Sequence, residues 1–126
     1  MKLQYLAYGS ADCPLIRRYD FQTADAGRLK ALADKLAGGS STLIALDEQT
    51  GILPVDGCQL NLRVSRRNRG IIQVAEFGFA CGLTNTGWSD VASLTEPFCG
   101  SVTDNAYQWL NEDGEISLLL SASGQR

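Results

Sequence analysis

The sequence predicts an α+β fold, in which a mainly antiparallel sheet of about six to seven strands carries two helices. Apolar and polar residues alternate in several short segments, which is typical of half-buried strands. Two other segments repeat apolar residues at helical spacing. Because most of the strands form neighbouring pairs joined by short turns, we expect antiparallel pairing and the order β-β-α-β-β-β-α-β-β.

The length and composition predict one globular domain over residues 1–126. A chain of 126 residues is long enough to bury its own core. Its apolar fraction of 44% and charged fraction of 20% are typical of soluble proteins. No apolar run is long enough to cross a membrane, and the first residues lack the apolar core of a signal peptide. We therefore expect a cytoplasmic protein that does not associate with membranes.

The N-terminal third is expected to form two strands and a helix. Residues 3–8 and 15–21 are the two strands. Thr23 is the type of residue that caps a helix N-terminus, and a helix over residues 24–37 follows it. Its apolar stripe consists of Leu29, Leu32, Ala33 and Leu36. The glycines at 38–39 end the helix, since glycine readily takes the left-handed conformation there.

The middle of the chain is expected to add three strands. Residues 42–46 form a short one. Residues 58–64 alternate apolar and polar side chains and predict a strand with one face in water. The segment 66–70 is its turn, and residues 71–79 return as the partner strand. That strand lacks simple alternation, so we expect it to be central in the sheet or bulged at Gly78.

The C-terminal third is expected to hold a helix and a hairpin. A turn at residues 84–87 leads into a helix over about 88–96, which Pro97 ends. Residues 107–121 give the strongest local signal, because two alternating segments flank a polar turn that ends in Asp113-Gly114. The rings expected to close the core are those of Trp88, Tyr107 and Trp109.

The residue types present disfavour several kinds of chemistry. The chain has no histidine, which removes histidine-activated nucleophiles, imidazole bases and histidine metal ligands. An enzyme is therefore the less favoured class. The cysteines are Cys13, Cys58, Cys81 and Cys99, and no pair has zinc-site spacing. We expect buried free thiols, no metal and no cofactor.

Charge is distributed unevenly along the chain. Residues 71–125 contain no lysine or arginine, while they carry seven carboxylates: Glu76, Asp90, Glu96, Asp104, Glu112, Asp113 and Glu115. Such a surface would attract a basic protein partner and raise its association rate. The alternative is a solvated surface whose charges pair with the N-terminal arginines. We expect a binding or regulatory protein of the immunity or accessory type that contacts a basic partner through this acidic half.

The segment before the acidic half suggests a second hypothesis. Arg63, Arg66, Arg67 and Arg69 cluster there without an acid between them. Guanidinium groups suit phosphate and carboxylate recognition, although a charged turn is also common for solubility alone. The calculated pI of 4.8 disfavours nucleic acid as a partner. The alternative function is a phosphate-ligand or nucleic-acid binder, or a histidine-less enzyme, that uses these arginines with Glu76 nearby.

Overall fold

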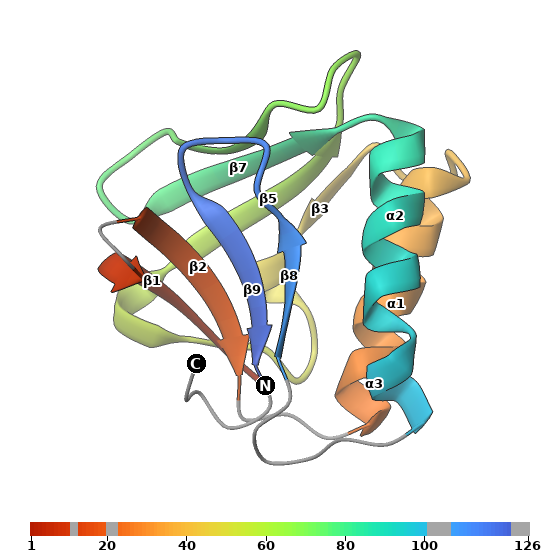
Figure 1. Ribbon diagram of the computed structural model, residues 1–126, viewed down its shortest axis with the longest axis horizontal. Helices are drawn as coiled ribbons and strands as arrows, with labels where there is room; N and C mark the ends of the chain where they lie inside the picture. The colour runs from red at the N-terminus through yellow and green to blue at the C-terminus, as the bar shows by residue number, and fades with distance from the viewer. Residues whose placement is uncertain (11–12, 20–22, 101–106, 122–126) are drawn as a thin grey trace.

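The computed structural model describes residues 1–10, 13–19, 23–100 and 107–121, with side chains in the first two strands placed only for residues 1–6. Over these ranges the chain forms nine strands and three α-helices (Figure 1). The strands are β1 (Lys2–Ser10), β2 (Cys13–Tyr19), β3 (Leu43–Ala45), β4 (Leu53–Pro54), β5 (Gln59–Val64), β6 (Gly70–Gln73), β7 (Gly78–Leu83), β8 (Tyr107–Asn111) and β9 (Ser117–Ser121). The helices are α1 (Thr23–Ala37), α2 (Asn85–Thr95) and α3 (Pro97–Gly100).

The strands form two sheets, so the prediction of one sheet with six to seven strands is wrong. One sheet has the order β4-β1-β2-β9-β8 and the other has the order β3-β5-β7-β6. Both contain parallel as well as antiparallel pairs, because β2 runs parallel to β9 and β5 runs parallel to β7. Parallel pairing joins strands that are distant along the chain, and local sequence patterns do not reveal it. The mixed α+β class and the antiparallel neighbours β1–β2 and β8–β9 are as predicted.

The segment 71–79 is two strands and not one. The backbone N–H of Val74 donates to Gly78 O at 2.8 Å, which closes a tight turn between β6 and β7. Strand β7 then lies between β5 and β6, antiparallel to β6. Of the two expectations for this segment, the central position is confirmed for β7, whereas Gly78 is the end of a turn and not a bulge. The prediction of a hairpin across residues 66–70 is also wrong. Strands β5 and β6 are not neighbours in the sheet, because β7 lies between them, and the connection crosses the end of β7.

The first helix is as predicted, and the second begins earlier than predicted. Helix α1 buries Leu29, Ala33 and Leu36 of its predicted stripe. Helix α2 begins at Asn85 because the Thr84 hydroxyl accepts a hydrogen bond from the Gly87 N–H at 3.0 Å and caps it. The two helices lie beside one another along one side of the molecule (Figure 1). No helix in the described ranges is both long enough and apolar enough to cross a membrane.

The C-terminal hairpin is confirmed as the antiparallel pair β8–β9. Strand β9 is buried along its whole length, because β2 and β8 flank it and its two faces are covered. Trp88 is 1% exposed, and its indole N–H donates to the carbonyl of Arg63 at 2.8 Å. The other two rings differ from the expectation of a closed aromatic core: Trp109 is only partly buried and Tyr107 is 50% exposed.

The two sheets meet where β6 approaches the start of β9. Ile71 and Ile116 form an antiparallel bridge at this corner. Gly70 has a φ of +69°, and a Cβ added there would lie 2.2 Å from the backbone nitrogen of Gly114. Glycine at positions 70 and 114 therefore lets the two backbone segments come into direct contact, because any side chain at Gly70 would clash with Gly114. Deeper in the core, the rings of Tyr5 and Phe79 pack across the two sheets with centroids 4.5 Å apart.

Candidate functional site

The arginine-rich segment is a loop held firmly against the end of β7. We call residues 65–69 the arginine loop. It leaves β5 with a hydrogen bond from Ser65 N to Leu83 O at 2.8 Å, and it returns with one from Arg69 N to Gly82 O at 2.9 Å. Between them, Asn68 Oδ1 accepts hydrogen bonds from the N–H and the hydroxyl of Thr84. The loop is therefore fixed at three points to the end of β7 and the residue that caps α2.

Three of the four arginines singled out in the sequence line one pocket, which we call the arginine pocket. Its volume is about 240 Å³, and it is lined by Arg63, Ser65, Arg66, Arg69, Gly70, Ile72, Ala80 and Gly82. Arg67 does not line it. All four arginine side chains are exposed, and none forms an ion pair with any other residue in the described ranges. The pocket thus combines a high density of positive charge with an absence of carboxylates in its lining.

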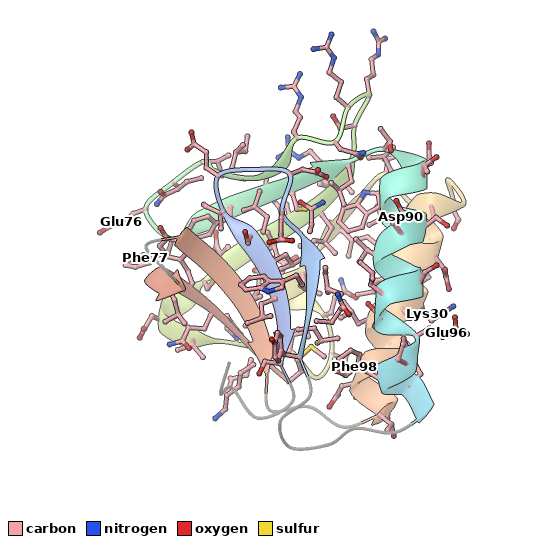
Figure 2. All side chains as sticks on the ribbon, in the orientation of Figure 1. Lys30, Glu76, Phe77, Asp90, Glu96 and Phe98 are labelled. Carbon is pink, nitrogen blue, oxygen red and sulfur yellow. The ribbon has the colours of Figure 1, made fainter. Side chains whose placement is uncertain are left out.

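Glu76 does not join this pocket or the other carboxylates. It lies in the turn between β6 and β7, next to the half-exposed ring of Phe77. Figure 2 shows both residues at one end of the molecule, whereas Asp90 and Glu96 lie along α2 on the other side. Glu76 is not among the residues that line the pocket with Arg63, so the hypothesis that pairs these two residues in one site has no geometric support.

Glu96 lies at the C-terminal end of α2 and faces a cation on α1. The Lys30 ammonium donates a hydrogen bond to Asp34 at 2.9 Å. That bond, the charge of Asp34 and, more weakly, the charge of Glu96 raise the pKa of Lys30 above its ordinary value. Figure 2 shows Lys30 and Glu96 close together. Glu96 therefore has a lysine of the N-terminal half in its neighbourhood, whereas the alternative of a solvated surface predicts pairing with the N-terminal arginines.

Three predicted carboxylates do come together, in a hollow between α2 and the β8–β9 turn. We call this hollow the acidic concavity. Its volume is about 310 Å³, and it is lined by Asn68, Gly87, Asp90, Leu94, Trp109, Leu110, Asn111, Glu112 and Asp113. No lysine or arginine lines it. Asp113 is held in place because its carboxylate accepts a hydrogen bond from the Asn111 amide at 2.7 Å, and its N–H donates to the Asn111 side-chain oxygen at 3.1 Å.

The remaining carboxylates lie elsewhere. Glu115 lines a larger groove of about 730 Å³ between β6 and the β8–β9 turn, together with Asp113 and with Arg69 of the arginine loop. Asp104 is outside the described residues. The seven carboxylates therefore do not form one continuous acidic face over the part of the chain that the structure describes.

Of the three thiols with described side chains, two are buried as expected. Cys58 and Cys81 are buried and Cys99 is partly buried, and none of the three forms a disulfide with another described residue. Burial, with a smaller contribution from the charge of Asp47, raises the pKa of the Cys58 thiol to about 11. Cys58 is therefore a protonated, unreactive thiol near neutral pH. Among the side chains that the structure describes, no three candidate ligands gather as a metal site would require, and the side chain of Cys13 is outside this set.

Four residues that shape these sites are not predicted from the sequence. Trp109 is expected in the core and Leu94 is not singled out by the sequence, yet both line the acidic concavity. Ser65 follows the alternating strand pattern and Asn68 falls in the predicted turn, and neither position indicates a site. Thr84 was the one available signal, because threonine is a preferred N-cap residue and predicts a helix that begins at residue 85.

Comparisons with known proteins add no relative. A scan against models of protein families found no match, and neither did searches of curated proteins and of solved structures.

Proposed function

We propose that the protein binds a basic protein partner, and that the acidic concavity holds a lysine or arginine side chain of that partner. One observation carries the proposal: Asp90 from α2 and Glu112 and Asp113 from the β8–β9 turn line one hollow that contains no basic residue. Three carboxylates around one hollow repel each other, and a cation that enters it relieves the repulsion.

The apolar residues of the acidic concavity suit the same ligand. The face of a tryptophan ring attracts a cation, and Trp109 is only partly buried in this hollow. Leu94 is 36% exposed and offers a surface for the aliphatic stem of lysine or arginine. An aromatic and an aliphatic contact inside a charged rim is the usual arrangement at a protein interface.

Of the seven carboxylates in the acidic half, only three are proposed to contact the partner directly. Glu76 is at the opposite end of the molecule, and Glu96 faces Lys30. They contribute to the overall field that attracts a basic partner, whereas Asp90, Glu112 and Asp113 contribute direct contacts. An immunity or accessory role in the cytoplasm, in which the protein covers the basic surface of another protein, is the form of this function that we favour.

The test compares neutral substitutions at matched positions. An oligolysine peptide is titrated into the protein at low ionic strength, and its affinity is measured by calorimetry for Asp90→Asn, Glu112→Gln, Asp113→Asn and Glu76→Gln. Each substitution removes one negative charge from an exposed side chain. We expect the three concavity variants to weaken binding by about threefold to tenfold, and Glu76→Gln by less than about twofold.

Two outcomes would contradict the proposal. Equal weakening by all four variants means that the peptide responds to net charge alone. Absence of saturable binding at low ionic strength means that the acidic concavity does not hold basic side chains.

A further inference from the structure

In the four-stranded sheet, β7 is an inner strand, and it carries almost no side-chain bulk on the face that points away from the core. Along β7, Phe79, Cys81 and Leu83 belong to the core, so by alternation Gly78, Ala80 and Gly82 point to the other face. The register places Gly82 between Arg63 of β5 and Gly70 of β6. Arg63 therefore lies beside a strip of sheet that has no bulk of its own.

The arginine pocket occupies the space above Gly82. A Cβ added to Gly82 would lie 3.7 Å from Cγ of Arg63 and 3.7 Å from the hydroxyl oxygen of Ser65. These two side chains therefore border the space that glycine leaves open. Ile72, which is 47% exposed, lines the pocket from β6. The pocket thus has a small-residue floor, one hydroxyl and one apolar wall.

The arginine loop is fixed beside this floor by the three attachments described above. Because the backbone is already held, a ligand has to order only the arginine side chains, and this reduces the cost of binding. The three arginines that line the pocket have no ion-pair partner among the described residues. Their guanidinium groups are exposed, so each can turn toward a ligand in the pocket without losing such a pair.

We propose that the arginine pocket binds the phosphate group of a small phosphomonoester, with Arg63, Arg66 and Arg69 as its cationic contacts and Ser65 as a hydroxyl donor. Guanidinium groups bind phosphate oxygens through paired, charge-assisted hydrogen bonds. A doubly charged phosphate offsets three cations better than a singly charged carboxylate does. This site is separate from the acidic concavity, and the proposal does not rest on the proposed function.

The surroundings of the pocket favour a small ligand over nucleic acid. Asn68 of the same loop lines the acidic concavity, and Asp113 and Glu115 line the neighbouring groove with Arg69. An extended polyanion would cross these carboxylates, which would repel its phosphates. A single phosphate group meets only the arginine pocket, whose lining contains no acid.

The chain offers a matched pair of substitutions as a test. Arg66→Gln and Arg67→Gln each remove one exposed guanidinium from adjacent positions of the same loop, and only Arg66 lines the pocket. Binding of phenyl phosphate and inorganic phosphate is measured by calorimetry at constant ionic strength, with sodium chloride as the control salt. We expect Arg66→Gln and Arg63→Gln to weaken phenyl phosphate binding about tenfold, and Arg67→Gln less than about twofold.

A second variant tests the pocket without changing charge. Gly82→Ala adds a methyl group on the floor, in ordinary contact with Ser65 and Arg63, so the protein should still fold. We expect its affinity for phenyl phosphate to fall about tenfold while its thermal unfolding stays close to that of the wild type.

Three results would overturn the inference. The first is no saturable binding of either phosphate up to about 10 mM. The second is equal weakening by Arg66→Gln and Arg67→Gln, or unchanged affinity in Gly82→Ala. The third is a short single-stranded DNA that binds more tightly than phenyl phosphate and loses affinity equally in both arginine variants, which would indicate general polyanion binding in place of a phosphomonoester pocket.

Discussion

The side-chain oxygen of Asn68 accepts two hydrogen bonds from Thr84, one from its backbone N–H at 2.9 Å and one from its hydroxyl at 3.1 Å. The same hydroxyl accepts a hydrogen bond from the Gly87 N–H at 3.0 Å and so caps α2. One polar network therefore joins the arginine loop to the first turn of the helix. Asn68 lines the acidic concavity, while its neighbour Arg69 lines the arginine pocket. The network thus holds a loop that contributes residues to both candidate sites.

Gly87→Ala should destabilise the protein although alanine favours helices. A Cβ at Gly87 would lie 2.4 Å from Oδ1 of Asn68 and 3.1 Å from Cβ of Leu83, so the Asn68 side chain has to leave its position. We expect a loss of about 2 kcal/mol in the free energy of unfolding, measured by urea titration. The loss exceeds the gain of about 1 kcal/mol that alanine gives over glycine inside a helix.

The Asn68→Gly background provides the control for this prediction. With the Asn68 side chain removed, Gly87→Ala meets only the Leu83 contact and should cost at least about 1 kcal/mol less than in the wild type. Additive effects of the two substitutions would show that Asn68 does not occupy the space above Gly87.

Gly70→Ala should be among the most destabilising single substitutions in the chain. An alanine at a φ of +69° is strained, and its Cβ would lie 2.2 Å from the backbone nitrogen of Gly114. Gly57 is the matched control, because its φ is +72° and a Cβ there meets nothing within 4 Å. We expect Gly57→Ala to cost about 1 kcal/mol and Gly70→Ala at least about 2 kcal/mol more, by urea unfolding. Similar costs at the two positions would mean that the two sheets do not meet at Gly70 and Gly114.

Stability should fall in alkali because of Cys58. The thiol has a pKa of about 11 in the folded protein, raised from 9.0 mainly by burial. Between these two values the unfolded chain releases the proton and the folded protein retains it, so the free energy of unfolding decreases as pH rises from about 9 to about 11. Below about pH 9 both states are protonated and the thiol adds no pH dependence.

The Cys58→Ala variant isolates this contribution. Other groups that titrate in alkali affect the wild type and the variant alike. We expect the wild type to lose on the order of 2 kcal/mol more than Cys58→Ala between about pH 8.5 and pH 11, by urea unfolding at each pH. Parallel pH profiles for the two proteins would contradict a protonated, buried thiol at this position.

Local patterns predicted the elements that depend on neighbouring residues. The apolar stripe and the glycines after it predicted α1, and the Asp113-Gly114 turn predicted the β8–β9 hairpin. The alternation of residues 58–64 predicted β5. These signals are local because helix faces, strand faces and turns are determined within a few residues.

The arrangement of the strands and the makeup of the sites depend on contacts between distant residues. The insertion of β7 between β5 and β6 rests on a parallel pair and on a turn whose residues, Val74 to Phe77, carry no strong turn signal. Since local patterns do not reveal this topology, the sequence predicts residues 66–70 as the tip of a hairpin. Likewise, Asp90 lines the same hollow as Glu112 and Asp113 only because α2 packs beside β8. Glu76 lies in the turn before β7, at the other end of the molecule.

The two tryptophans provide the most direct measurement of the central proposal. Trp109 lines the acidic concavity, whereas the indole N–H of Trp88 is buried against the carbonyl of Arg63. In a ¹H–¹⁵N NMR titration with an oligolysine peptide, we expect the Trp109 indole signal and the backbone signals of Asp90, Glu112 and Asp113 to shift in a saturable manner. The signals of Trp88 and Glu76 should remain in place. Shifts spread evenly over all exposed carboxylates, or an unmoved Trp109 signal at saturation, would contradict a basic side chain bound in the acidic concavity.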